Sequence, residues 1–130
     1  MKSTHLIYAI SLMVFSCSKK FDVTAHFDPA HSFELIDQQH PSGVLIETEI
    51  QVNTPKHIQL LSWLLSNKHD WRKAPHNTHA GLIIVSQGDF RILFYRDDNR
   101  IVVAYDDKEN VMQQYIKDMD SNELGFLLED

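Results

Sequence analysis

Hydrophobic and polar positions between residues 44 and 52 alternate with the period of two that is typical of strands. In the segment 44–52, aliphatic or β-branched residues occupy the even positions, and acidic or amide residues occupy most of the odd ones. This alternation predicts a strand with one face in water. The run Phe33-Glu34-Leu35-Ile36 predicts a shorter strand before it, and Pro41-Ser42-Gly43 predicts a turn between the two.

The next segment changes to the period of a helix. Thr54 and Pro55 are typical of an N-cap and a first helical position, because proline has no amide hydrogen to lose there. Asn67 is expected to end this helix. Its apolar stripe is expected to face the core, and consists of Ile58, Leu61, Leu64 and Leu65, widened by Leu60 and Trp63.

The second half of the chain predicts three short strands followed by a helix. The strands are expected at 81–86, 90–96 and 101–105, because the short links between them contain Gly, Asn or Asp and favour antiparallel hairpins. Asp106 or Asp107 is expected to cap a second helix, and the residues that would share its apolar face are Val111, Met112, Tyr115, Ile116 and Met119.

The end of the chain predicts one more helical turn. The segment Asp120-Ser121-Asn122-Glu123 resembles a capping box, and the apolar residues after it are expected to dock on the core. They are Leu124, Phe126, Leu127 and Leu128. The order ββαβββα predicts an α+β fold, in which an antiparallel sheet of about five strands has two main helices packed on one face.

The start of the chain has a different pattern. An apolar stretch from Leu6 to Phe15 follows the basic residue Lys2, and it is too short for a spanning helix, which needs about 20 residues. Residues 1–16 are therefore expected to be a signal peptide that is cleaved. The stretch ends in Val14-Phe15-Ser16-Cys17, which resembles the lipobox of bacterial lipoproteins, although Phe15 stands where a smaller residue is usual.

The resemblance to bacterial lipoproteins implies that Cys17 carries acyl chains, and two or more such chains anchor a protein stably. Ser18 follows this cysteine, where lipoproteins of the inner membrane carry Asp, so the resemblance implies the periplasmic side of the outer membrane. Residues 17–30 are then expected to be a lipid-anchored tether, and residues 31–130 a single domain. The alternative is an ordinary signal peptide that contains a cysteine.

Charge and cysteine content narrow the possible partners. The chain has 12 basic and 18 acidic side chains, with a net charge of −6, and much of the acidic excess follows Asp97. Nucleic-acid binding needs clustered Lys and Arg, so no nucleic-acid partner is expected. Because Cys17 is the only cysteine, no disulfide within the chain and no cysteine nucleophile is expected. An acidic surface can steer a basic partner, or it can simply keep the domain soluble.

Histidines in the loop after the first helix are candidates for metal binding. His69, His76 and His79, with Asp70 nearby, have the donor types that zinc and copper prefer. The loop contains no cysteine and no helical His-x-x-x-His pair, so a histidine-rich surface loop is the favoured interpretation and no metal or other cofactor is expected.

No catalytic motif is recognisable. There is no Gly-x-Ser-x-Gly sequence and no glycine-rich phosphate loop, and Glu47 and Glu49 alternate as residues on a solvated strand face do. We therefore expect that this protein is not an enzyme. A disulfide-free, lipid-anchored periplasmic domain of this size is expected to act by binding, and it is similar in general size and anchoring to small periplasmic inhibitor and immunity lipoproteins.

The expected partner is an envelope-acting hydrolase or toxin. Trp, Tyr and Arg are favoured at protein interfaces, and the candidate partner-binding residues are Trp71, Arg72, His76, His79 and Tyr95. For Trp63 and Trp71, a role as core anchors is the alternative. Two other functions remain open: an accessory lipoprotein that binds an envelope-assembly complex or peptidoglycan, and a periplasmic metal-binding module.

Overall fold

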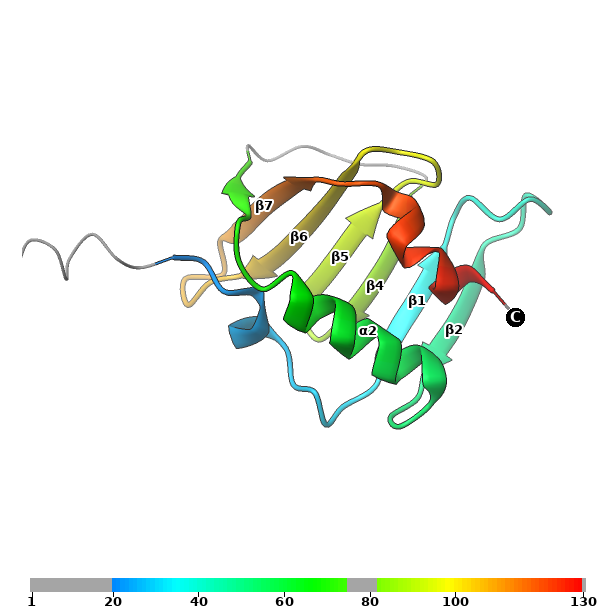
Figure 1. Cartoon of the computed structure of the whole chain (residues 1–130), viewed down its shortest axis with the longest axis horizontal. Helices are drawn as coiled ribbons and strands as arrows, with labels where there is room; N and C mark the ends of the chain where they lie inside the picture. The colour runs from blue at the N-terminus through cyan, green and yellow to red at the C-terminus, as the bar shows by residue number, and fades with distance from the viewer. Residues whose placement is uncertain (1–19, 75–81, 130) are drawn as a thin grey trace, which may run out of the picture.

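An antiparallel sheet forms the frame of the protein (Figure 1). The computed structural model describes residues 20–74 and 82–129, and within them seven strands lie in the spatial order β2-β1-β4-β5-β6-β7-β3. The α+β class and the antiparallel sheet are confirmed, whereas about five strands had been expected. The strands are β1 (Phe33–Asp37), β2 (Ile46–Ile50), β3 (Arg72–Lys73), β4 (Ile83–Gln87), β5 (Phe90–Phe94), β6 (Arg100–Asp106) and β7 (Met112–Asp118).

Tight turns connect β4, β5 and β6 as the sequence predicts. Gln87 pairs with Phe90, so Gly88 and Asp89 form a two-residue turn, and Gly88 adopts the positive φ of 59° that glycine tolerates best. Asp97 has a φ of 56° in the next turn, in keeping with the tolerance of Asp for this conformation.

The prediction of a second helix is wrong, because residues 112–118 form strand β7. Asp107 does not cap a helix; its carboxylate accepts hydrogen bonds from the amides of Glu109 (2.9 Å) and Val111 (3.0 Å) and closes a turn. These bonds, led by that of Val111, lower the pKa of Asp107. The chain then pairs with β6 over seven residues. Strand β7 has apolar side chains on both faces, and their spacing is also compatible with one face of a helix. The pairing with β6 decides in favour of the strand.

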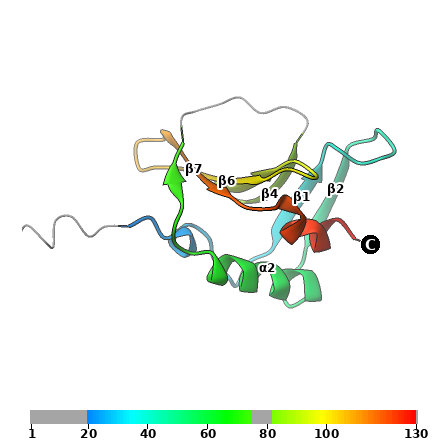
Figure 2. The same ribbon diagram turned by 45° about the horizontal axis from the view of Figure 1, so that its top comes forward.

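Three helical segments lie on one face of the sheet (Figure 2). They are the 3-10 helix η1 (Val23–His26), the α-helix α2 (Pro55–Ser66) and the 3-10 helix η2 (Ser121–Leu128). Thr54 caps α2, Pro55 begins it and Asn67 ends it, as predicted. In η2, Leu124 and Leu127 are buried in the core, and Phe126 and Leu128 pack against it.

The buried face of α2 differs from the predicted stripe. The helix buries His57 and Leu60, together with Trp63 and Leu64 further along, whereas Ile58 is 58% exposed and Leu65 is 60% exposed. Nε2 of His57 lies 2.9 Å from the carbonyl oxygen of His31, a contact that compensates part of the cost of burying the imidazole. A histidine counted as polar therefore lies in the core, and the helix is turned away from the orientation that its aliphatic residues favour.

The expected tether packs on the domain from Phe21 onward. Val23 is fully buried, and Phe21 and Phe27 pack against the core. The amide of Val23 donates to the carbonyl of Lys68 (3.1 Å), just after the end of α2. The boundary expected at residue 30 is therefore too late, because burial of these apolar side chains fixes the segment. Among the residues that the structure describes, no helix is long and apolar enough to cross a membrane.

Candidate interaction surfaces

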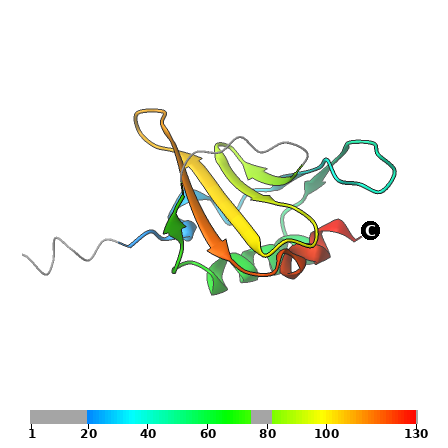
Figure 3. The same cartoon turned by 90° about the horizontal axis from the view of Figure 1, so that it is seen from above.

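The two faces of the sheet carry different side chains. Because side chains alternate along a strand, the register assigns each residue to a face. The face under α2, η1 and η2 holds the core, and we call the opposite one the helix-free face (Figure 3). The register places one residue of each strand in a row across this face: Glu47, Ile36, Ile84, Leu93, Val102, Ile116 and Arg72.

This row is apolar in the middle and charged at both ends. Ile36, Ile84 and Leu93 are half-buried, and Val102 and Ile116 are buried, although no helix in the described parts of the chain covers this face. Glu47 and Arg72 end the row on the two outermost strands and are exposed. An apolar centre with a charged rim is the usual anatomy of a protein interface.

Of the predicted partner-binding residues, Arg72 lies on the helix-free face. Its guanidinium donates to both carboxylate oxygens of Asp118, at 3.0 Å each, and the two side chains are 56% and 61% exposed. This bidentate geometry fixes the orientation of the Arg72 side chain, although an exposed pair of this kind adds little stability.

Trp71 lies in the core instead, as the alternative interpretation held. Its ring meets that of Trp63 edge to face at 6.3 Å, and its indole Nε1 donates to the carbonyl of Asn67 at 2.5 Å. The ammonium group of Lys117 lies 4.9 Å from the ring centre. The prediction that Trp71 is an interface residue is therefore wrong, because its indole ring is used in packing.

Tyr95 follows β5 and lines a small cavity of about 70 Å³. The other lining residues are Leu82, Leu93, Phe94, Asp98, Arg100 and Val102. Three strand spacings separate Tyr95 from Arg72, so the sheet does not place the two residues in a single site. The remaining predicted residues, Cys17, His76 and His79, lie outside the described residues.

The metal-binding hypothesis is represented here only by His69 and Asp70, because the other two histidines fall outside the described ranges. Both residues are exposed, and the carbonyl of His69 accepts a hydrogen bond from Nζ of Lys117 at 2.6 Å. Within residues 20–74 and 82–129, no group of three or more side chains is placed to hold a metal ion.

An acidic rim that the sequence pattern does not reveal lies at the β2 end of the helix-free face. Glu34 of β1 lies directly opposite Glu49 of β2, and Ile36 lies opposite Glu47. The three glutamates line a groove of about 410 Å³ together with Leu35, Ile36 and Thr48. The alternation in β2 predicted that Glu47 and Glu49 share a face, but only the register adds Glu34 to them.

Two arginines of this face are paired, unlike the glutamates of the acidic rim. Arg72, on the outermost strand β3, binds Asp118, and Arg91, on the central strand β5, lies 3.5 Å from Asp106. No ion pair within the described part of the chain involves a glutamate of the acidic rim.

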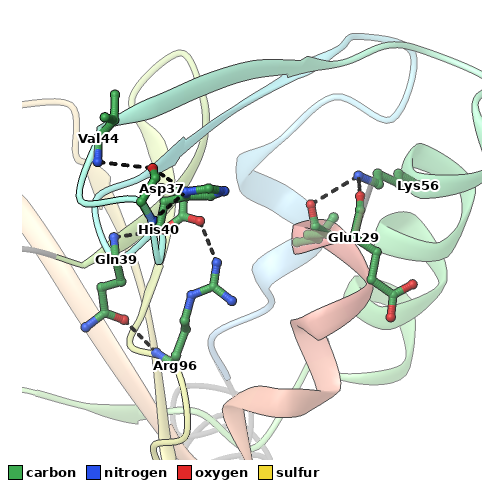
Figure 4. Close-up of polar contacts among 9 residues, drawn as sticks. Asp37, Gln39, His40, Val44, Lys56, Arg96 and Glu129 are labelled. Carbon is green, nitrogen blue, oxygen red and sulfur yellow. Dashed lines mark hydrogen bonds and ion pairs between the residues drawn. The ribbon is translucent and has the colours of Figure 1, made fainter.

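An ion pair between the buried Asp37 and the half-buried Arg96 fixes the end of β1 beside the loop that leads to β2 (Figure 4). Nη2 of Arg96 donates to the Asp37 carboxylate at 2.6 Å, and the amide of Gln39 donates to the same carboxylate at 2.9 Å. Gln39 in turn accepts from the amide of Arg96 through its side-chain oxygen at 2.7 Å. These bonds join the loop to the chain after β5 and so hold β2 in place.

A second set of contacts in Figure 4 joins the start of α2 to the end of the chain. The ammonium group of Lys56 donates to the carbonyls of Leu127 and Glu129. Leu127 lies near the end of η2 and Glu129 directly follows it, so the lysine joins the two helical elements on the covered face.

Stacked rings attach the N-terminal segment to the covered face. Phe21 lies 3.8 Å from Tyr115, and His26 lies 3.7 Å from Tyr105, between ring centres. Burial lowers the pKa of His26, an effect that nearby carboxylates partly oppose, and burial also raises the pKa of Tyr105. The neutral forms of both rings are therefore favoured, as suits a packing contact.

Comparison of the chain with protein-family models, with curated proteins and with solved structures gave no match.

Proposed function

We propose that this chain is a lipid-anchored periplasmic inhibitor or immunity-type lipoprotein that blocks an envelope-acting hydrolase or toxin. One observation carries the proposal: the helix-free face has an apolar centre between charged rims. Such a surface suits a protein partner better than a small substrate, because protein interfaces are broad and small-molecule sites are concave.

The packing of the N-terminal segment supports a role at the membrane. Cys17, the proposed site of lipidation, lies four residues before Phe21, which packs against the core. Four extended residues span at most about 14 Å, so lipid on Cys17 would hold the domain at the membrane surface. An inhibitor in this position would meet enzymes and toxins as they act on the envelope.

The first experiment asks whether Cys17 is lipidated. The full chain is expressed in a bacterium supplied with labelled palmitate, beside the Cys17→Ser variant. We expect label in the full chain and in the membrane fraction, and no label in the variant. Label in both proteins, or in neither, would contradict the anchor.

The second experiment tests inhibition. The full chain, purified in detergent, is used as bait for envelope proteins of the producing bacterium, and captured hydrolases or toxins are assayed with increasing amounts of it. We expect dose-dependent loss of their activity. Capture of peptidoglycan or an assembly complex, with no inhibition, would instead favour the accessory function.

A pair of variants ties the inhibition to the helix-free face. Arg100→Glu reverses a charge on that face, and Lys108→Glu makes the same change in the loop between β6 and β7. Both side chains are exposed, so both variants are expected to fold. We expect Arg100→Glu to weaken inhibition by about tenfold or more, and Lys108→Glu to leave it within about twofold.

A further inference from the structure

Strand β2 is an outermost strand of the sheet (Figure 1). It pairs with β1 through five consecutive residues, from Ile46 to Ile50, and with no other strand that the structure describes. Its outer edge therefore presents a row of amide and carbonyl groups that have no strand partner. Such an edge is a template on which another extended chain can add.

Charge is the one usual form of edge protection that β2 carries, and its two glutamates disfavour the addition of acidic strands but not of basic ones. Proteins often protect an edge strand with proline, lysine or a bulge, and the segment Ile46-Glu47-Thr48-Glu49-Ile50 has no proline, no lysine and an unbroken register. The other edge of the sheet differs, because β3 has only two residues. Of the two edges, β2 is therefore the one long enough to bind a strand.

The charges of β2 select the kind of strand that can add. Glu47 and Glu49 lie on the helix-free face, and Glu34 lies directly opposite Glu49 on the neighbouring strand. Carboxylates directly opposite each other repel, and the described chain supplies no basic side chain to pair with them. Lysine or arginine on an added strand would neutralise this repulsion, and residues two apart on that strand would lie beside Glu47 and Glu49.

Exposed apolar residues flank the edge at both ends. Val44 and Leu45, which precede β2, are 61% and 49% exposed, and Val52 follows it with 37% exposure. An added strand longer than β2 would cover these side chains at its ends. The complementary segment is therefore basic at alternate central positions and apolar at its ends.

A second copy of this chain does not fit the edge. Antiparallel pairing of two β2 strands about Thr48 would place Glu47 of each copy directly opposite Glu49 of the other. Four carboxylates would then gather on one face, beside the Glu34 side chains of both copies, and like charges directly opposite are unfavourable.

We propose that β2 binds an extended basic segment of a partner protein as an eighth strand, with lysine or arginine at alternate positions beside Glu47 and Glu49. This inference rests on the proposed function in that the partner is a protein, and it adds the surface and the chemistry of that partner.

The test uses the full chain and a synthetic nine-residue peptide that alternates Lys and Thr at its centre and has Val at its ends. Binding is measured by fluorescence anisotropy of the labelled peptide. Two control peptides carry Glu in place of Lys, or the same residues with all Lys adjacent. We expect saturable binding of the alternating Lys peptide only. No binding of it, or equal binding of all three, would overturn the inference.

A pair of double variants tests whether the peptide binds at β2. Glu47→Gln with Glu49→Gln removes two charges from β2, and Asp89→Asn with Glu109→Gln removes two exposed charges from turns elsewhere. We expect the first variant to weaken binding by about tenfold and the second to change it by less than about twofold. Equal losses would mean that only the net charge of the chain attracts the peptide, and the inference would fail.

N-methylated peptides test the backbone pairing, because a strand uses the amides of alternate residues on each edge. One peptide is methylated at its odd positions and another at its even positions. We expect one of them to bind and the other to lose binding. Equal binding of both would exclude strand addition.

These results separate the inference from the proposed function. Loss of peptide binding, with inhibition of the partner kept, would overturn only the role of β2. Peptide binding with no inhibition of any envelope hydrolase or toxin would overturn only the inhibitor function.

Discussion

The covered face and the helix-free face belong to the same strands but hold their side chains in different ways. On the covered face Phe33, Phe90 and Ile92 are fully buried beneath the helical elements. On the helix-free face Ile84 and Leu93 are only half-buried, although Val102 and Ile116 of the same row are buried, and charged residues end the row on both sides. Burial of apolar area is the main source of stability, so we infer that the covered face contributes most of the stability, and that the half-buried part of the helix-free face on β1, β4 and β5 is available to bind.

The largest effect is expected from truncation of the covered core. Phe90→Ala should lower the free energy of unfolding by about 3–5 kcal/mol, because the ring is fully buried against its neighbours. The matched change Leu93→Ala on the helix-free face should cost about 1 kcal/mol, because that side chain is half-exposed. Urea unfolding followed by tryptophan fluorescence measures both. Equal losses would contradict the assignment of stability to the covered face.

The second-largest difference in stability is expected between the two ion pairs, one on each face of the sheet. Asp37→Ala removes a carboxylate that is 5% exposed and leaves Arg96 without its partner, so a loss of about 2 kcal/mol is expected. Asp118→Ala, which removes the exposed partner of Arg72, should cost less than about 1 kcal/mol. Urea unfolding at neutral pH checks the pair, and a larger loss from Asp118→Ala would refute the expected order.

A smaller, pH-dependent effect should arise at His26 on the covered face. Burial holds the pKa of its imidazole below the ordinary value of 6.5, so the unfolded chain takes up a proton at a higher pH than the folded chain. Stability is therefore complete above pH 6.5 and falls as the pH is lowered from there toward the folded pKa. His26→Phe keeps a ring beside Tyr105 but cannot titrate, so its unfolding free energy should fall less over this range. Parallel pH profiles would contradict the prediction.

The smallest effect expected is a gain in stability, whereas the preceding truncations cause losses. Glu49→Lys replaces the carboxylate that faces Glu34 by a positive charge, so the free energy of unfolding should rise by about 0.5 kcal/mol. Glu109→Lys, in an exposed loop, is the control and should have little effect on stability. If the acidic rim binds a basic partner, the variant should also lose that binding. A loss of stability in Glu49→Lys would show that the two glutamates do not repel.

The parts of the fold that were predicted correctly are those with local causes. Thr54, Pro55 and Asn67 bound α2 because capping and the missing proline amide act within one helical turn. The hairpins of β4, β5 and β6 follow from turn residues such as Gly88. The mistaken helix after Asp107 also has a local cause, because the same carboxylate can cap a helix or close a turn.

The candidate surfaces were harder to predict than the elements. Residue type predicts Arg72, Tyr95 and Trp71 as interface residues. Arg72 lies on the helix-free face and Tyr95 lines a small cavity, whereas Trp71 lies in the core. The acidic rim joins Glu34 to Glu49, which are far apart in the sequence. Residue type indicates what a side chain can do, but the strand register decides which side chains meet.

The sequence by itself determined the α+β class, the main helix and the hairpins of β4, β5 and β6, and its Cys17 motif predicts a membrane anchor. Only the tertiary structure decided that residues 112–118 form a strand, that His57 faces the core and that Phe21 packs on the domain. The physical reason is range: caps and turns depend on neighbours within a few residues, whereas burial, strand pairing and opposed charges depend on residues that only the folded chain brings together.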